Sequence, residues 1–305
     1  MVNGIDNIRR TVDVSTRALV GTALGLALAG FTGEGPTTQQ VGENLYAYVS
    51  DNDGSSNSTF LVTSKGILVV DTGIDEKEAE KLLSAIRKIS DRPIRYIVNT
   101  HYHPDHQAGN RFVGPQADII STKWTHDRTR AILDNPEANA QVSGFRFQPA
   151  TVAFDDRIDV HLGKYRVQIF HPGKAHTSGD ALVYFPSQKV MAMGDLYLTN
   201  SSPAMDRGSV LNWIDTLGEV LEGPAETFVP GHFEVTSGEE LRRAHDYLAE
   251  LRDQVSRLIE AEASLERVRA EIQMQDYADF RQYPQWGATF ADNAEVLYRE
   301  LKESN

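Results

Sequence analysis

Three histidines and one aspartate lie within six consecutive residues of this chain. His101, His103, Asp105 and His106 follow directly after the mostly apolar run 94–98, which is expected to form a buried strand. His101 and His103 alternate, so in an extended or tightly turned backbone their imidazoles lie on one side and can bind one cation. Asp105 and His106 then point elsewhere, toward a second cation. The alternative is a polar loop with solvated histidines, but this spacing arises by chance in only about one such chain per thousand.

The spacing H-x-H-x-D-H resembles the metal motif of the metallo-β-lactamase superfamily. This resemblance indicates that the remaining ligands lie at later strand ends. The chain has His176 in a P-G-K-A-H-T-S-G-D loop, Asp195 at the end of an apolar run, and His232 in V-P-G-H. A single histidine after a strand is more often a structural hydrogen-bonding residue. Together, however, the three occur in the order found in the family, which chance explains poorly.

The resemblance divides the ligands between two metal ions that share one carboxylate. It implies His101, His103 and His176 on one metal, Asp105, His106 and His232 on the other, and Asp195 as the bridge. Imidazole and carboxylate ligands without thiolate suit zinc, with iron or manganese as alternatives. We therefore expect two Zn²⁺ per chain, with a bridging hydroxide as the nucleophile. Asp105 would act both as ligand and as transient proton carrier.

Two further aspartates are expected to support the ligands without binding metal. Asp71 lies in D-T-G, which looks like the family sequence whose aspartate orients the metal loop. The alternative for Asp71 is a cap on the following helix, although Asp75 and Glu78 already have the form of a capping box. Asp180, in the loop that carries His176, is the second candidate.

Two aromatic residues are predicted to contact the substrate. Tyr197 lies two residues after Asp195, whereas the oxyanion-assisting tyrosine of the family's lactonases usually lies three residues after the bridging aspartate. A tyrosine at a strand end is more often a packing residue. Trp213 lies in the expected helix 211–217, directly after the polar loop 199–210 that should border the metals.

The fold implied by the resemblance is an α/β protein, an αββα sandwich of two mixed β-sheets flanked by helices, with a C-terminal helical extension. A chain of 305 residues that is 40% hydrophobic can bury one such domain. We place this domain at 34–236, with residues 32–40 as a linker into it. Residues 237–305 form C-terminal helices packed on the same domain, because 237–240 has capping-box form and an apolar stripe follows.

The C-terminal segment 277–290 contains five aromatic residues: Tyr277, Phe280, Tyr283, Trp286 and Phe290. A packing or homodimer surface is the first interpretation of this segment, and a pocket wall is the second.

Residues 1–33 form either a signal peptide or an N-terminal helix. The apolar run 18–31 follows three arginines and ends near A-L-A, a form typical of a cleavage site. This favours a periplasmic or secreted protein, with a cytoplasmic one as the alternative. The run is too short to form a comfortable membrane span. The net charge of −13 repels phosphate backbones and argues against nucleic-acid partners, and the absence of cysteine excludes disulfides and thiolate metal sites.

The leading functional hypothesis is a dinuclear zinc hydrolase that attacks a small carbonyl substrate, such as a lactone, lactam, ester or thioester. A true β-lactamase is disfavoured because Asp195 stands where such enzymes of the family commonly have cysteine or serine. A mononuclear iron oxidoreductase similar to the persulfide dioxygenases would not need the second ligand set. A non-catalytic metal binder would be expected to have lost some ligands. Substrate selection is expected to depend on the loops 51–58, 135–149 and 199–210.

Overall fold

The computed structural model describes residues 35–141, 144–145, 147–205 and 208–303. The predicted signal peptide or N-terminal helix at residues 1–33 lies outside this described part of the chain.

The first sheet has seven strands that follow one another in chain order. They are β1 (Thr37–Gly42), β2 (Leu45–Val49), β3 (Ser58–Thr63), β4 (Gly66–Val70), β5 (Ile94–Val98), β6 (Asp118–Thr122) and β7 (Val152–Phe154). Strands β1 to β4 pair in antiparallel fashion, whereas β4 to β7 are parallel to one another. The carboxyl ends of β4 and β5 therefore lie side by side.

The second sheet has five strands in the order β12, β11, β10, β9, β8. They are β8 (Arg157–Leu162), β9 (Tyr165–Phe170), β10 (Leu182–Phe185), β11 (Val190–Leu198) and β12 (Thr227–His232). All neighbours are antiparallel except β11 and β12, whose parallel pairing is interrupted between Ala192 and Leu198. Both sheets are thus mixed.

Apolar residues of the two sheets face each other and form one buried core. Leu61, Leu68 and Val98 from the first sheet pack in this core with Val183 and Val229 from the second. Their complete burial keeps the strand ends of both sheets in a fixed relation, since close-packed interiors resist displacement.

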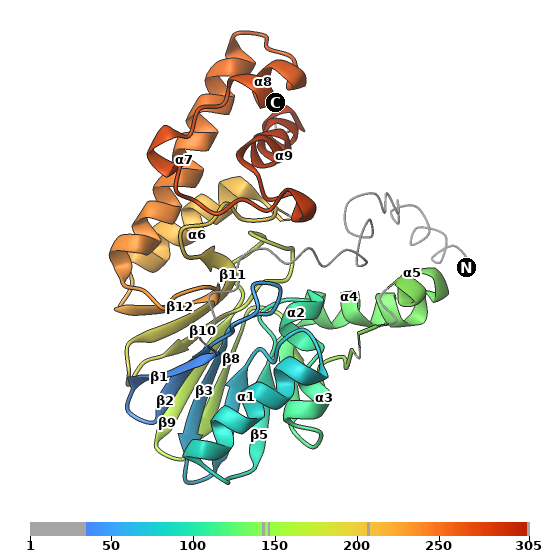
Figure 1. Ribbon diagram of the computed structural model, residues 1–305, viewed down its shortest axis with the longest axis vertical. Helices are drawn as coiled ribbons and strands as arrows, with labels where there is room; N and C mark the ends of the chain where they lie inside the picture. Colours follow the sequence, from blue (N-terminus) through green and yellow to red (C-terminus); the bar gives the residue numbers. More distant parts are fainter. Residues whose placement is uncertain (1–34, 142–143, 146, 206–207, 304–305) are drawn as a thin grey trace, which may run out of the picture.

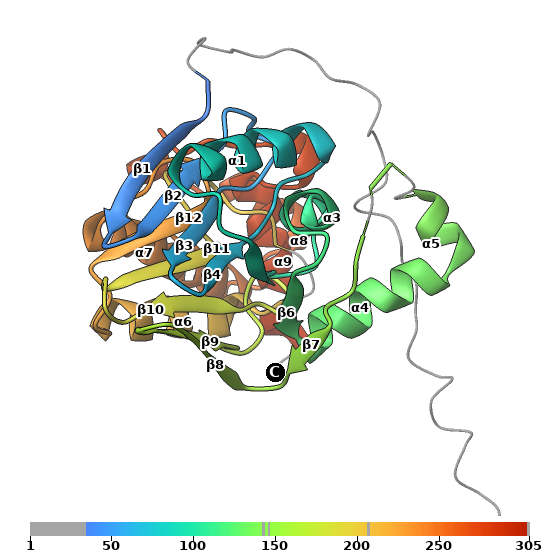
Figure 2. The same ribbon diagram turned by 90° about the horizontal axis from the view of Figure 1, so that it is seen from below.

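Helices cover the outer face of each sheet. Helix α1 (Glu76–Ile89) buries its apolar stripe, including Leu82 and Ile86, against the first sheet. Helices α6 (Val210–Glu222) and α7 (Gly238–Glu260) pack on the second sheet through a separate core cluster. Figure 2 shows α1 beside the first sheet, and Figure 1 shows α6 above β11 and β12 of the second sheet. The predicted αββα sandwich is confirmed.

The remaining helices are shorter than α1 or follow the second sheet in the chain. They are α2 (Pro104–Gln107), α3 (Asn110–Val113), α4 (Lys123–Asp134), α5 (Pro136–Gln141), α8 (Leu265–Glu271) and α9 (Phe290–Glu303), with the 3₁₀ turns η1 (Gln275–Tyr277) and η2 (Pro284–Trp286). Helix α3 packs beside α1. Helices α7, α8 and α9 form the predicted C-terminal extension at the top of Figure 1. Leu251, Val268 and Leu297 from these helices share a buried cluster with Leu196 and Trp213.

Two segments differ from the sequence-based expectation. The predicted linker 32–40 contributes to β1, an edge strand whose polar residues T-T-Q-Q are exposed. No apolar alternation marks such a strand, because neither of its faces is buried. The expected loop 135–149 contains α5. Within the described residues, no helix has the length and apolar character that crossing a membrane requires.

Replacement of Leu251 by alanine tests whether α7 belongs to the same folding unit as the sheets. Leu251 is 0% exposed, so Leu251→Ala should lower the free energy of unfolding by about 2–5 kcal/mol. Thermal unfolding followed by circular dichroism should still show one transition. Val296→Ala, at a position 36% exposed, should change stability by less than about 1 kcal/mol. A separate early transition in the Leu251 variant would contradict a shared core.

Candidate metal centre

The predicted metal-ligand motif follows β5 and continues into α2. His101 and His103 lie in the turn between these elements, and Asp105 and His106 lie in the first turns of α2. His106 and His101 are buried, while the side chain of Asp105 is 21% exposed. Solvent therefore reaches this motif on the side of Asp105.

The first ligand cluster consists of His101, His103, His176 and Asp195. One ligand atom from each lies within 4.8 Å of the others. Nδ1 of His103 lies 2.9 Å from Nε2 of His101 and 3.1 Å from Nε2 of His176. Three imidazole nitrogens thus converge from the turn after β5 and from the loop between β9 and β10.

The second ligand cluster consists of Asp105, His106, His232 and the same Asp195. Oδ2 of Asp105 lies 3.1 Å from Nε2 of His232 and 3.2 Å from Nε2 of His106. His232 ends β12, so this cluster combines α2 with the last strand of the second sheet. The structure brings every predicted ligand residue into one of the two predicted groups.

Asp195 belongs to both clusters because its two carboxylate oxygens face different sides. Oδ1 lies 3.1 Å from Nε2 of His106 and 3.6 Å from Nε2 of His232. Oδ2 lies 3.6 Å from Nε2 of His176 and 3.9 Å from Nε2 of His101. This arrangement is that of a carboxylate able to bridge two cations.

The ligand atoms of the two clusters are arranged to bind metal ions, and two of them are left without a hydrogen bond. Nε2 of His106 and Oδ1 of Asp195 lie 3.1 Å apart, yet neither of these buried atoms makes a hydrogen bond, which is costly unless a ligand satisfies them. Burial, followed by the neighbouring His106 and His103, holds the pKa of His101 well below its ordinary value. His101 is therefore neutral, which is the form that binds metal.

The carboxylate of Asp195 is held in its ionised form. Burial alone would raise its pKa, but the charges of His106 and His232 lower the pKa well below its ordinary value. A neutral His101 in the first cluster and an ionised carboxylate shared by both clusters are suited to a dinuclear metal site.

Asp71 connects both clusters to the end of β4. It accepts hydrogen bonds from the backbone N of Thr100 at 2.9 Å, from Thr100 Oγ1 at 2.7 Å and from His106 Nδ1 at 2.8 Å. The cap of α1 is Asp75, which accepts from Glu78 N. Asp71 therefore supports the metal-ligand turn and does not cap the helix.

The same contacts orient the ligand rings. Nδ1 of His106 donates to Asp71, so its Nε2 points into the second cluster, toward Asp105 and Asp195. Thr100 Oγ1, which donates to Asp71, lies 3.1 Å from His101 Nδ1 and can accept its proton. His176 Nδ1 lies 2.8 Å from the carbonyl oxygen of Ala204. Thr100 was not predicted, since a threonine beside a motif carries no signal of its own.

Asp180 stabilises the loop that carries His176. Its carboxylate accepts from the backbone N of Thr177 at 2.8 Å and from the hydroxyl of Thr177. Burial raises the pKa of Asp180 to about 7, and the hydrogen bonds from Thr177 offset this only in part.

The two predicted substrate contacts are corrected by their burial. Tyr197 and Trp213 are each 1% exposed and belong to the core beneath α6 and α7. The hydroxyl of Tyr197 lies 2.8 Å from Thr236 Oγ1, and Trp213 Nε1 donates to the carbonyl of Leu196 at 2.9 Å. Trp213 packs against the ligand His176, with ring centroids 5.7 Å apart. Both residues therefore pack in the interior, where a substrate does not reach.

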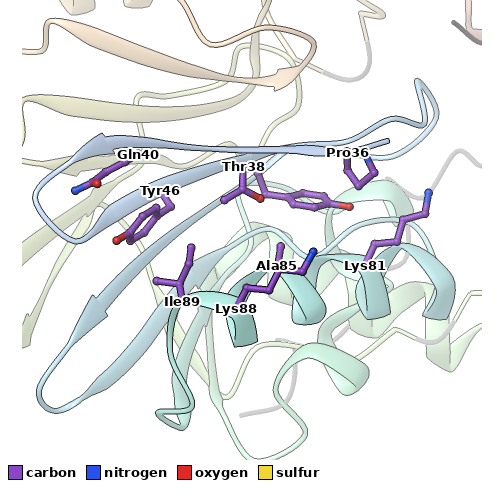
Figure 3. Close-up of a pocket in the computed structure, with 9 residues that line it drawn as sticks. Pro36, Thr38, Gln40, Tyr46, Lys81, Ala85, Lys88 and Ile89 are labelled. Atoms are coloured by element: carbon purple, nitrogen blue, oxygen red, sulfur yellow. The ribbon is translucent and has the colours of Figure 1, made fainter. Parts of the chain in front are cut away.

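A groove of about 480 Å³ lies elsewhere on the molecule, between β1, β2 and α1. Figure 3 shows Tyr46 and Thr38 on one side of it and Lys81, Ala85 and Lys88 on the other. None of the ligand residues lines this groove, so it is separate from the metal centre.

Removal of the Asp71 carboxylate tests its supporting role. Asp71→Ala should weaken zinc binding by roughly 10- to 100-fold, because His106 and His101 lose the contacts that orient them. The affinity would be measured by competition with a chelator. Asp75→Ala is the matched control, since it removes the cap of α1 at about 1 kcal/mol of stability and leaves the ligands in place. Wild-type affinity in the Asp71 variant would contradict this role.

Asp180→Asn tests the effect of the buried acid on stability. The folded state holds a proton on Asp180 up to about pH 7, whereas the unfolded chain loses it near pH 4. The stabilising contribution of Asp180 therefore falls as the pH rises from about 4 to 7. In urea titrations, the stability of Asp180→Asn relative to wild type should increase over this range. A stability difference between Asp180→Asn and the wild type that stays constant over this pH range would refute the raised pKa of Asp180.

The comparison with known proteins supports the same assignment. A family model described as the metallo-beta-lactamase superfamily matches residues 51–232. A metallo-beta-lactamase type 2 from Elizabethkingia meningoseptica is 30% identical over 190 residues, which cover 59% of this chain and 71% of that protein. A linear primary-alkylsulfatase from a Pseudomonas species is 26% identical over 240 residues, and the chain spans only 45% of its length.

Solved structures show the same fold. A metallo-beta-lactamase from Pontibacter korlensis superposes with a TM-score of 0.59 at 20% identity, covering 70% of this chain and 99% of that chain. A double mutant of a sec-alkyl sulfatase superposes with a TM-score of 0.67 at 15% identity, covering 87% of this chain and 50% of that chain.

The matched range of the family model is more than half of the chain and contains every residue of the two ligand clusters. The αββα sandwich carries these clusters at the strand ends of its two sheets. The chain therefore belongs to the metallo-β-lactamase superfamily, and it is a metal-dependent hydrolase of that fold.

Proposed function

We propose that this protein hydrolyses a small carbonyl substrate, such as a lactone, lactam, ester or thioester, at a centre that holds two zinc ions. The observation that carries the proposal is the position of Asp195, with one carboxylate oxygen toward each ligand cluster. When bound, a pair of divalent cations supplies hydroxide near neutral pH and polarises the carbonyl oxygen.

Asp105 is the proposed proton carrier. It is the ligand carboxylate with the more exposed side chain, 21% against 10% for Asp195. Burial alone would raise the pKa of Asp105, but His106 and His232 lower it well below its ordinary value. Asp105 is therefore an ionised base at the open side of the centre, placed to accept a proton from the attacking water and to return it to the leaving group.

Two other activities fit the ligands less well. A mononuclear iron oxidoreductase of the persulfide dioxygenase type would use the first cluster and leave the second without a role. A true β-lactamase has the support of the relative from Elizabethkingia meningoseptica, but the carboxylate of Asp195 at the bridging position favours an ester-cleaving enzyme.

Sulfate-ester hydrolysis is the second candidate function. The match to the linear primary-alkylsulfatase covers 63% of this chain, against 59% for the metallo-beta-lactamase type 2. Its similarity to this chain supports sulfate esters as an alternative substrate class. The reaction would again use both ligand clusters, with a sulfate ester in place of the carboxylic ester.

The location and assembly of the protein are proposed from its sequence. The arginines and the apolar run within residues 1–33 support export to the periplasm or the medium. A homodimer formed through the C-terminal helices is proposed from the aromatic residues of the segment 277–290.

A screen of purified, zinc-loaded protein against lactones, lactams, thioesters, carboxylic esters and sulfate esters tests the proposed function. Asp195→Ala and His176→Ala should each lower kcat/KM by roughly 10²- to 10⁴-fold, since each removes a ligand of the centre. Metal analysis should give about two zinc ions per wild-type chain and fewer in both variants.

Asp127→Ala is the control for this screen, because Asp127 pairs with Lys123 on the exposed face of α4. It should keep wild-type kinetics and metal content. Full activity in both ligand variants, or one iron per chain with oxygen uptake on a persulfide, would refute the proposal.

A further inference from the structure

Three aromatic side chains form a continuous stack that begins beside the ligand His232. The rings of Phe233 and Tyr283 are nearly parallel, with centroids 6.2 Å apart, and those of Tyr283 and Trp286 are 4.6 Å apart. Phe233 directly follows His232, and the centroids of their rings are 6.0 Å apart. The aromatic stack thus extends from the second ligand cluster to the surface, where Trp286 is 40% exposed.

The stack is assembled from segments that are far apart in the chain. Tyr283 and Trp286 come from the connection between α8 and α9, which Figure 1 shows as the orange-red segment beside α6. Backbone hydrogen bonds join this connection to the segment after β11, from Ser202 N to Arg281 O and from Arg281 N to Asn200 O, both at 2.9 Å. The side chain of Arg281 also donates to Thr199 O and lies over the ring of Phe233 at 4.2 Å. The position of the stack is therefore fixed by the fold.

The loop 51–58 closes the other side of the same region. Tyr283 donates its hydroxyl proton to Asp53 at 3.3 Å. Ser56 N donates to the carbonyl of Asp105 at 3.2 Å, and Asn57 N donates to the carbonyl of Gly231 at 2.7 Å. The loop and the stack are thus attached to each other and to the turns that carry Asp105 and His232.

Phe233 has an unusual backbone conformation. Its φ is +74°, in the left-handed region that a bulky residue rarely adopts. Asn57 Nδ2 donates to the carbonyl of Phe233 at 2.7 Å and holds this conformation. Strain of this kind is retained mainly at functional sites, and here it directs the ring toward Tyr283.

The exposed surface of the stack lies on the accessible side of the centre. His101, His106, His176 and His232 are buried, whereas the side chain of Asp105, whose carbonyl binds the loop 51–58, is 21% exposed. Among the described residues, Trp286 is the most exposed large apolar side chain. An exposed aromatic side chain that is connected to a ligand of the reaction centre through stacked rings is suited to bind part of a substrate.

We propose that Phe233, Tyr283 and Trp286 form the wall that binds a flat aromatic group of an uncharged substrate, and that Trp286 determines the preference for it. This inference rests on the proposed ester hydrolysis and specifies its substrate class. The three residues lie beyond residue 232, where the family match ends, so the wall is a feature added to the common metal centre.

The charges around the stack favour a neutral substrate over a carboxylate. Arg281, the cation at the stack, already pairs with Glu234 at 3.1 Å and donates to Thr199. Asp53, which accepts the hydrogen bond from the Tyr283 hydroxyl, adds a negative charge beside the stack. An anionic group bound at the stack would therefore lie near Asp53 and Glu234, with Arg281 already paired.

Two esters with the same leaving group test the wall. Hydrolysis of methyl acetate and of methyl phenylacetate adds water across the acyl C–O bond and releases methanol, so the substrates differ only by a phenyl ring. The zinc-loaded wild type should prefer methyl phenylacetate by about tenfold or more in kcat/KM. Trp286→Ala should lose most of this preference without changing turnover of methyl acetate, and Trp286→Phe should keep it. Equal losses on both esters, or an unchanged preference in Trp286→Ala, would overturn the proposal.

A binding measurement separates the wall from the chemistry. Phenylacetone has the carbonyl and the ring but no leaving group, so its binding does not depend on hydrolysis. It should quench the tryptophan fluorescence of the wild type, and this change should be absent in Trp286→Phe, which retains Trp124 and Trp213. Quenching without hydrolysis of either ester would support the wall and refute the ester hydrolase. Hydrolysis of methyl acetate without quenching would refute the wall and leave the hydrolase standing.

Discussion

The metal centre depends on the buried carboxylate of Asp71. A buried charge is costly unless it is fully hydrogen-bonded, and Asp71 meets this condition through Thr100 and His106. The parallel register that pairs Val70 with Val98 places Asp71 beside the turn that follows β5. One side chain thereby joins two strands and orients ligands of both clusters, His106 directly and His101 through Thr100. Its φ of +55° shows that the backbone, too, is bent to reach this position.

The second sheet places Asp195 and His232 opposite the metal-ligand turn that Asp71 supports. β11 and β12 are parallel, so Asp195 and His232 emerge near the same end of the second sheet. The interrupted pairing after Ala192 and the left-handed Gly194 turn Asp195 between the clusters. Gly231 permits the close approach of β12, since a Cβ there would lie 2.0 Å from Oδ1 of Asp195. The core between the sheets holds these ends together.

Residues that act through local sequence could be predicted, and residues that act through remote contacts could not. The ligand motif, the D-T-G sequence that contains Asp71, and the apolar stripe of α1 could each be recognised from neighbouring residues alone. Tyr197 follows the irregular part of β11, where simple alternation no longer indicates which way a side chain points. The polar edge strand β1 carries no apolar pattern. The contact between Phe233 and Tyr283 joins distant segments, and the aromatic residues of 277–290 did not indicate their partner.

The attachment of the loop 51–58 has a consequence for how the enzyme recognises its substrate. Backbone bonds tie Ser56 to Asp105 and Asn57 to Gly231, so the entrance is already shaped before any molecule arrives. The loop 51–58 therefore loses its conformational entropy when the protein folds, and binding of a substrate does not have to order it. In the proposed enzyme, a loop ordered in this way would favour a narrow group of molecules whose shape matches it.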